Sequence, residues 1–263
     1  MSLRPWWDDL YVLFGIFSLA VGLMVYLWLI LAAYFYRKKP GDKPARDALK
    51  AGVFPHERGN KLVEAGWTFG AFFVVFILTI VSVPALEYVS APPKDCTDPE
   101  VVCVNVIGHQ WFWEFDVQYP AGSKVLYDAG SQFTVPDGGV IAYSNGSTRT
   151  FAPGESVKFN DATSVAFPNG LRAISNTNLD LPCGRTIILV IDSADVIHAF
   201  WIPDYGIKAD AIRNRQQLLW FEANDPGTYR SPCAEYCGDM HTFMIGSVKV
   251  SPADGCPGSS ACC

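Results

Sequence analysis

The sequence predicts an α+β membrane protein, with an N-terminal two-helix transmembrane hairpin followed by a β-sandwich or barrel outside the membrane. Two long runs without charge, Leu10 to Tyr36 and Ala65 to Leu86, indicate the helices. Short apolar segments separated by Pro and Gly turns indicate the strands that follow. Half of the 263 residues are hydrophobic and only 17% are charged, a composition typical of chains that contact lipid.

Both uncharged runs are long enough to cross a bilayer. The second spans about 33 Å as a helix, and a hydrocarbon core is about 30 Å thick. Two buried helices of a soluble protein are the alternative, which these lengths disfavour. The first run is too long for a signal-peptide core, so we expect a retained helix. We predict helices at about residues 10–36 and 63–86, within an N-terminal unit of residues 1–90.

The link between the helices, residues 37–61, predicts their orientation. It holds eight Lys or Arg and three acids, whereas one Arg and two acids precede the first run. By the positive-inside rule the link lies in the cytoplasm. Both termini and the outer domain are then expected on the outer, periplasmic side of the cell (or inner) membrane.

The chain after Tyr88 is polar enough for a folded domain, expected over residues 91–252 with a tail at 253–263. It contains 11 Lys and Arg and 19 Asp and Glu, a net charge of about −8. This excess of acid argues against nucleic acid as a partner and suits a basic protein. All eight cysteines lie here, in a compartment where disulfides persist.

The residue pattern predicts several strands. Residues 101–117 alternate in the strand manner, which places Trp111, Trp113 and Phe115 on one face. Three further segments are expected to form strands: 186–191, 218–221 and 247–250. Short strands with regular turns are typical of a sandwich or barrel.

One twelve-residue segment gathers the metal-binding chemistry. Cys233, Cys237, His241 and Met244 supply two thiols, an imidazole and a thioether, and His198 lies 35 residues before the first of them. A helix would separate Cys233 from Met244 by about 16 Å, too far for one site. The proline before the segment and the glycine within it favour a curled loop that points its side chains at one centre.

Soft thiolate and thioether ligands combined with imidazole favour copper in a redox site. Zinc would accept two Cys and two His, but it has no use for the Met244 thioether. A disulfide between Cys233 and Cys237 is the simplest alternative, because outward-facing cysteines usually pair. The spacing of His198, His241 and Met244 around the two thiols favours copper.

These residues resemble a known family. Cys233-Ala-Glu-Tyr-Cys-Gly-Asp-Met-His-Thr-Phe-Met and Ser193-Ala-Asp-Val-Ile-His-Ala-Phe-Trp-Ile-Pro look like the CuA domain of cytochrome c oxidase subunit II. Gly108-His-Gln-Trp-Phe-Trp resembles that family's aromatic segment, and Glu64-Ala-Gly-Trp-Thr resembles the start of its second membrane helix. The resemblance covers about residues 60–117 and 180–250. It implies two membrane helices followed by an extracytoplasmic cupredoxin-like Greek-key β-sandwich.

The resemblance also implies a dinuclear copper centre, CuA. Its implied ligands are His198, Cys233, Cys237, His241, Met244 and the backbone carbonyl of Glu235. The two thiolates would bridge both coppers, with His198 and Met244 on one copper and His241 and Glu235 on the other. The Glu235 side chain would reach a magnesium ion shared with the catalytic subunit, since a hard cation suits carboxylate oxygen.

Two further roles are implied by the resemblance. Trp111 would be the residue at which electrons enter the chain, although on a strand it could equally be a core aromatic. Glu64 matches a glutamate at the mouth of a proton pathway into the catalytic subunit. An acid at the edge of a membrane helix could equally be an interfacial residue.

The implied function is electron transfer within a terminal haem–copper oxidase of the respiratory chain, an oxidoreductase with oxygen as acceptor. The chain would take electrons from an external donor such as cytochrome c and pass them to haem in catalytic subunit I, with a subunit III in the same membrane complex. Oxygen reduction, coupled to proton translocation, would occur in subunit I. No Cys-x-x-Cys-His occurs, so no haem is expected in this chain.

Three alternatives stay open at this point. One is the copper subunit of a nitric oxide reductase, which differs only in the acceptor. A second is the copper-free structural subunit of a quinol oxidase, which the filled ligand positions disfavour. A third is a zinc-binding or disulfide-stapled adhesion module on a membrane anchor.

Six cysteines lie outside the ligand set: Cys96, Cys103, Cys183, Cys256, Cys262 and Cys263. They allow 15 pairings if all are bridged. Proximity favours Cys96 with Cys103. The stretch from about Tyr119 to Asn176 is longer than the family's core needs, and the sequence assigns it no role.

Overall fold

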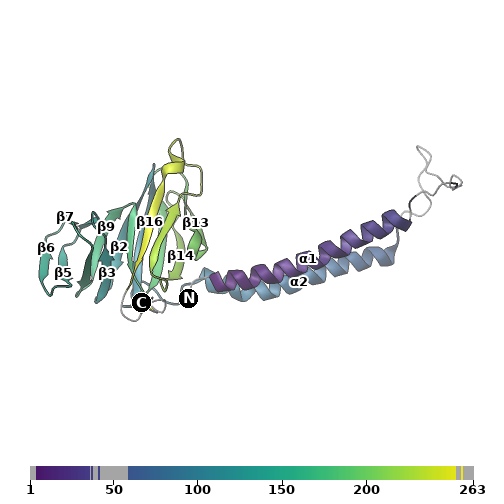
Figure 1. Cartoon of the computed structure of the whole chain (residues 1–263), viewed down its shortest axis with the longest axis horizontal. Coiled ribbons are helices and arrows are strands. Elements are labelled where there is room, and N and C mark those ends of the chain that lie inside the picture. Colours follow the sequence, from purple (N-terminus) through teal and green to yellow (C-terminus); the bar gives the residue numbers. More distant parts are fainter. Residues whose placement is uncertain (1–3, 36, 38–40, 42–58, 253–255, 257–263) are drawn as a thin grey trace. The chain divides into compact units, whose positions relative to one another are not determined.

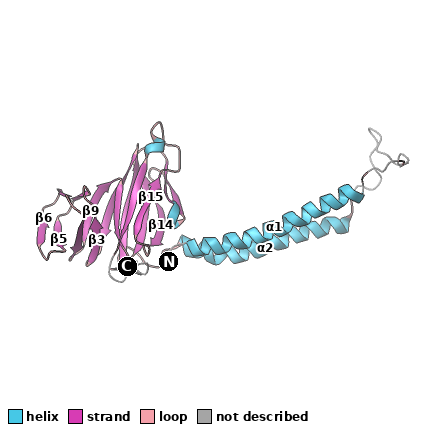
Figure 2. Cartoon of the chain, in the orientation of Figure 1, coloured by secondary structure: helices cyan, strands magenta, loops and turns pink. Residues whose placement is uncertain are grey.

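The structure, a computed structural model, describes residues 4–35, 37, 41, 59–252 and 256. Helices α1 (Arg4–Phe35) and α2 (Lys61–Ser90) come first, and the described chain after them consists of strands and loops with two three-residue 3-10 helices (Figures 1 and 2). The chain divides into a helical unit, Asp8–Leu86, and a β unit that contains Glu87–Cys263. Most of the basic link used to predict the orientation lies outside the described residues.

Both helices are long and apolar enough to cross a membrane, over Asp8–Phe35 and Lys61–Tyr88. Nearly all of their apolar side chains are exposed in this chain, as expected for surfaces that contact lipid. Each helix is longer than its uncharged run predicted, because polar residues at a membrane surface can continue the helical hydrogen bonding. Before α2, the Asn60 side chain accepts hydrogen bonds from the amides of Leu62 and Val63.

The described β unit contains sixteen strands in four sheets. They are β1 (Val101–His109), β2 (Phe112–Tyr119), β3 (Ser123–Tyr127), β4 (Gln132–Val135), β5 (Gly139–Tyr143), β6 (Thr148–Phe151), β7 (Glu155–Lys158), β8 (Thr163–Phe167), β9 (Leu171–Asn176), β10 (Asn178–Pro182), β11 (Thr186–Ser193), β12 (His198–Ile202), β13 (Ile207–Ala211), β14 (Gln217–Glu222), β15 (Gly227–Pro232) and β16 (Ile245–Ser251). The sheet orders are β14-β11-β1-β2-β9-β4-β7, β3-β8-β5-β6, β10-β16-β15 and β12-β13.

One hydrophobic core joins these sheets. In β1 the buried Val102, Val104 and Val106 alternate along the strand, and Trp113 and Phe115 of β2 are buried beside them. The segment expected as a strand covered on both faces lies within β11, which pairs with β1 in parallel and with β14 in antiparallel register. The predicted class, two apolar helices followed by a β-sandwich domain, is confirmed.

The expected single alternating strand over residues 101–117 is wrong. The segment is a hairpin in which β1 and β2 pair, with His109 opposite Phe112 and Val104 opposite Val117. Trp111 therefore lies in the turn and not on the strand face that Trp113 occupies. Alternation has the same period on both sides of a two-residue turn, so the pattern does not reveal that the chain reverses.

The stretch of residues 119–176 is part of the same fold. Its strands β9, β4 and β7 extend the seven-stranded sheet beyond β2, and its other strands β3, β8, β5 and β6 form the four-stranded sheet. Tyr127, Phe133 and Phe159 pack together with ring centroids 4.7–6.0 Å apart. These rings belong to the same buried cluster as Trp113, so the added strands lengthen the sandwich.

Two disulfides staple the β unit. Cys96–Cys103 forms as proximity predicted. Cys183–Cys256 closes a loop with a sequence separation of 73 residues, which stabilises the fold by about 4 kcal/mol in the chain-entropy account. The sequence left this second pairing open, and Cys262 and Cys263 lie outside the described residues.

Candidate metal centre

The residues with metal-binding chemistry meet where β12 and the loop between β15 and β16 come together. His198 is the first residue of β12, and Cys233 directly follows β15. The loop is curled, as predicted, because the Cys233 amide donates to the Met244 carbonyl at 2.9 Å. The Ala234 amide donates to the Ala199 carbonyl at 2.9 Å, which ties the loop to β12.

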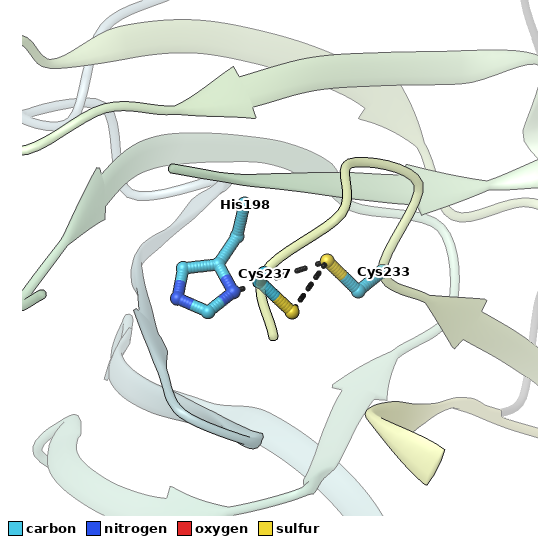
Figure 3. Close-up of side chains that lie close together, drawn as sticks. All are labelled: His198, Cys233 and Cys237. Atoms are coloured by element: carbon cyan, nitrogen blue, oxygen red, sulfur yellow. Dashed lines mark hydrogen bonds between the residues drawn. The ribbon is translucent and has the colours of Figure 1, made fainter. Parts of the chain in front are cut away.

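Two thiols form the middle of the site (Figure 3). The sulfurs of Cys233 and Cys237 lie 3.8 Å apart. Both side chains are buried, and neither forms a disulfide. The Cys233 sulfur is 3.9 Å from Nδ1 of His198 and 3.2 Å from the Glu235 carbonyl oxygen. Ligand atoms of His198, Cys233 and Cys237 all lie within 4.8 Å of one another.

Two more donors approach the second sulfur. Nδ1 of His241 lies 3.4 Å from the Cys237 sulfur, and the thioether sulfur of Met244 lies 3.8 Å from it. Met244 is fully buried, which places its sulfur in the interior of the site and away from solvent. All six ligand positions implied by the resemblance therefore lie together.

These spacings fit metal coordination. Metal bonds of about 2.3 Å to sulfur and 2.0 Å to imidazole nitrogen, at a tetrahedral angle, separate two sulfurs by about 3.8 Å and a sulfur from a nitrogen by about 3.6 Å. The observed separations of 3.8, 3.9 and 3.4 Å match this pattern. The residues present can thus hold metal between the thiols with little rearrangement.

The two thiols have different proton affinities. Burial opposes ionisation of Cys233, but hydrogen bonds with His198 and with backbone groups outweigh it and lower the pKa of this thiol. Burial, together with the negative charge of Cys233, raises the pKa of Cys237. Thiolates are the form that binds metal, so one of the two sulfurs is already favoured as a ligand.

A carboxylate behind His198 fixes the orientation of the imidazole. Asp195 Oδ1 lies 2.8 Å from Nε2 of His198, while Asp195 Oδ2 accepts a hydrogen bond from the backbone amide of Gln110 at 2.7 Å. Because Nε2 is held in this way, Nδ1 faces Cys233. The partial burial of Asp195 opposes its ionisation, but the hydrogen bonds with His198, Gln110 and Val196 outweigh this and lower its pKa.

Trp111 contacts the loop that carries the thiols. Its indole Nε1 donates to the Cys237 carbonyl at 3.2 Å, and the Gln110 side chain donates to the same oxygen at 2.8 Å. Gly238 has φ +120°, and a Cβ there would lie 3.1 Å from the side-chain nitrogen Nε2 of Gln110 and 3.2 Å from the indole nitrogen of Trp111. Glycine at this position lets the turn and the loop approach closely.

Trp113 plays a different part. It is fully buried, with its ring 5.9 Å from the His198 ring and 5.0 Å from that of Phe200, both in edge contact. A Cβ at Gly108 would lie 2.8 Å from the imidazole, so this glycine lets β1 pass close behind His198. Trp113 is therefore a residue of the hydrophobic core, whereas Trp111 is only partly buried.

The loop also presents exposed apolar side chains. The exposed fractions are 73% for Tyr236, 47% for Met240 and 74% for Phe243, and Ile197 beside β12 is 50% exposed. Large apolar side chains at the surface of a loop suit contact with another protein.

Glu64 belongs to a different unit of the chain from the residues of this site. Glu64 is exposed in the first turn of α2, within the helical unit, so its suggested role remains a prediction. Neither Asp195 nor Gln110 was predicted from the sequence to be functional. An acid three residues before a candidate histidine ligand was the available signal for Asp195, whereas Gln110 acts through contacts that only folding brings about.

Comparisons with known proteins agree with this geometry. The sequence profile described as "Cytochrome C oxidase subunit II, periplasmic domain" matches residues 161–251. The chain is 26% identical over 246 residues to cytochrome c oxidase subunit 2 of Alkalihalophilus pseudofirmus, covering 91% of this chain and 53% of that protein. It is 27% identical over 245 residues to cytochrome c oxidase subunit 2 of Cereibacter sphaeroides, covering 93% of this chain and 71% of that protein.

A solved structure gives a similar match. The periplasmic domain of cytochrome oxidase subunit II from Bradyrhizobium japonicum is 24% identical, with a TM-score of 0.35, over 61% of this chain and 87% of that chain. The chain spans about half the length of the Alkalihalophilus protein. The profile matches the outer domain over residues 161–251, and relatives align across most of the chain, so this chain is similar to cytochrome c oxidase subunit II proteins.

Proposed function

We propose that this chain is the electron-transfer subunit of a terminal haem–copper oxidase and carries a dinuclear copper centre. It accepts electrons from an external donor, such as a cytochrome c, and passes them to haem in catalytic subunit I for oxygen reduction coupled to proton translocation. The copper domain and both termini lie on the outer side of the membrane. The observation that carries this proposal is the pair of free, buried thiols 3.8 Å apart, with two imidazoles and a thioether around them.

The donor set favours copper over zinc and over a disulfide. Met244 places a buried thioether 3.8 Å from the Cys237 sulfur, and soft sulfur ligands with imidazole select copper. Cys233 and Cys237 are unbonded, while two other cysteine pairs in the same domain form disulfides. Cys233 and Cys237, with the donors around them, would hold a copper pair, which when bound would supply one-electron transfer.

The protein's part is to hold these ligands still. His198 is fixed from behind by Asp195, and the loop is closed by the bond between Cys233 and Met244. A rigid ligand set changes little between oxidised and reduced states, which keeps the reorganisation on electron transfer small. In this role Trp111 connects the surface to the loop through its hydrogen bond to Cys237.

Contacts with other subunits complete the proposal. The exposed Glu235 side chain supports a magnesium ion at the interface with subunit I, because hard cations prefer carboxylate oxygen. Exposed apolar residues on the loop, among them Tyr236 and Phe243, suit burial against a partner of the complex. Glu64 supports proton intake at the membrane edge, and a subunit III is the further expected neighbour.

Metal analysis of the purified chain tests the proposal. We expect two coppers per chain, a purple oxidised form and a mixed-valence EPR signal, because two thiolates and four further donors are available. One zinc with no copper would refute the copper assignment. A chain that bound no metal while correctly folded would favour the copper-free role found in quinol oxidases.

A nitric oxide reductase is the second candidate, because the final acceptor is bound by another subunit. Turnover of the purified complex with oxygen and with nitric oxide, measured side by side, separates the two. Oxygen consumption with a reduced cytochrome donor is the expected result.

The charge of the outer domain predicts that salt weakens donor binding. Its net charge of about −8 attracts a basic cytochrome, and salt at 0.1 M screens charges beyond about 10 Å. The KM for a basic cytochrome c should therefore rise as salt increases from about 0.02 to 0.2 M, measured by steady-state turnover. A KM that stays constant over this range would contradict electrostatic docking.

A further inference from the structure

A polar cavity of about 290 Å³ lies where the strands of residues 119–176 join the sandwich. Its walls come from the turn after β3, the start of β10 and the paired strands β15 and β16. Its polar lining includes Asp128, Ser131, Asn178, Asp180, Thr228, Ser247 and Lys249. None of the proposed copper ligands lines it. A second cavity of about 550 Å³ shares Gly130 and Asn178 with the first.

Asp180 is an uncompensated carboxylate in this cavity. It is only 8% exposed, and among the described residues no hydrogen bond to its carboxylate offsets the cost of burial. Lys249 is the cation that acts on it, but the ammonium of Lys249 is paired with Asp128 at 2.5 Å. Two carboxylates therefore share one ammonium, which leaves one net negative charge at a buried position.

Asp116 shows how this domain normally treats a buried acid. It is also 8% exposed, yet Arg172 binds it with two hydrogen bonds of 2.9 Å each. Asp180 has no such partner, and a buried charge without one costs several kcal/mol. Something that the protein chain does not supply must balance Asp180.

We propose that this cavity binds one small hard cation, Na⁺ or Ca²⁺, through oxygen atoms. A guest cation supplies the missing positive charge. Ser131, Thr228, Ser247 and Asn178 line the same cavity, and their side chains carry further oxygens, the donors that hard cations prefer. The volume leaves room for water molecules to complete the coordination. The bound cation joins the added strands to the sandwich.

Asp180 could instead be neutralised by a proton, and the pH dependence of stability distinguishes protonation from cation binding. Burial raises the pKa of Asp180 to about 7, although Lys249 acts in the opposite direction. The other groups facing it are Asp128 and the hydroxyls of Tyr119 and Tyr127, whose pKa values are raised by burial so that both stay neutral. In the unfolded chain an Asp has a pKa of about 3.9. Ionisation thus destabilises the folded domain as pH rises from about 4 to 7, and a cation stabilises it only where Asp180 is ionised.

Thermal unfolding of the full chain in detergent tests the proposal, with near-UV circular dichroism reporting on the outer domain. At about pH 8.5 and equal ionic strength, NaCl or CaCl₂ should raise the midpoint by about 5–10 °C relative to choline chloride. At about pH 5.5 the three salts should give the same midpoint. The salt that acts at high pH identifies the ion.

Variants define the site. Asp180→Asn should abolish the cation response, while Asp116→Asn, its control at equal burial, should lower the midpoint and keep the response. Lys249→Met should enlarge the response, because both carboxylates then face the guest. Equal wild-type midpoints in all three salts, a response that is the same at both pH values, or a response that survives Asp180→Asn would overturn the proposal. The wild-type comparison at two pH values decides the matter even if a variant fails to fold.

Discussion

Replacing Cys237 by serine is expected to abolish the mixed-valence copper signal. Its sulfur lies 3.8 Å from that of Cys233, 3.4 Å from Nδ1 of His241 and 3.8 Å from the Met244 thioether, so it is the most connected donor of the site. A single remaining thiolate cannot bridge two metals symmetrically. We expect copper content to fall to one per chain or less, and turnover with cytochrome c to fall by at least about a hundredfold.

Copper analysis, EPR and oxygen consumption on the same preparation check this result. The matched control is the double variant Cys96→Ser/Cys103→Ser, which removes a disulfide away from the ligand loop and should keep both coppers. Cys233→Ser should behave like Cys237→Ser. An unchanged signal in either single variant would mean that the two thiols do not bridge the metals.

Replacing Trp111 by glutamine is expected to slow electron uptake and leave the copper site nearly intact. The indole donates a hydrogen bond to the Cys237 carbonyl, which gives a short path from the partly buried ring to a ligand residue. It is not itself a ligand. Donor oxidation should fall by about ten- to a hundredfold, because transfer depends steeply on placement. Copper content and the internal transfer from copper to haem, followed by flash kinetics, should stay near wild-type values.

Trp201→Gln is the matched control, because it changes another partly exposed tryptophan near the site. Trp201 is 38% exposed in β12, close in sequence to His198, and it makes no hydrogen bond to the thiol loop among the described contacts. Trp113 is unsuitable, because it is fully buried against the His198 ring and its loss would disturb the ligand directly. If Trp201→Gln slowed donor oxidation and Trp111→Gln did not, the relay would run through the other tryptophan. Normal turnover in both variants would contradict the relay.

The sequence by itself determined the features that depend on local pattern. Uncharged runs predicted both helices, because a hydrocarbon core admits few other arrangements of a polar backbone. The continuous apolar segment within β11 and the disulfide between Cys96 and Cys103 also followed from neighbours along the chain. The set of donors, from His198 to Met244, followed from residue type and spacing.

Only the tertiary structure decided what depends on residues far apart in the chain. Trp111 proved to lie in a turn, since alternation alone does not reveal a reversal. The partners Asp195 and Gln110 meet across 85 residues, and Cys183 meets Cys256 across 73. The charge of Asp180 has no cation of its own, because packing places the Lys249 ammonium against Asp128. Composition and periodicity report what one segment prefers, whereas a site is fixed by which segments pack together.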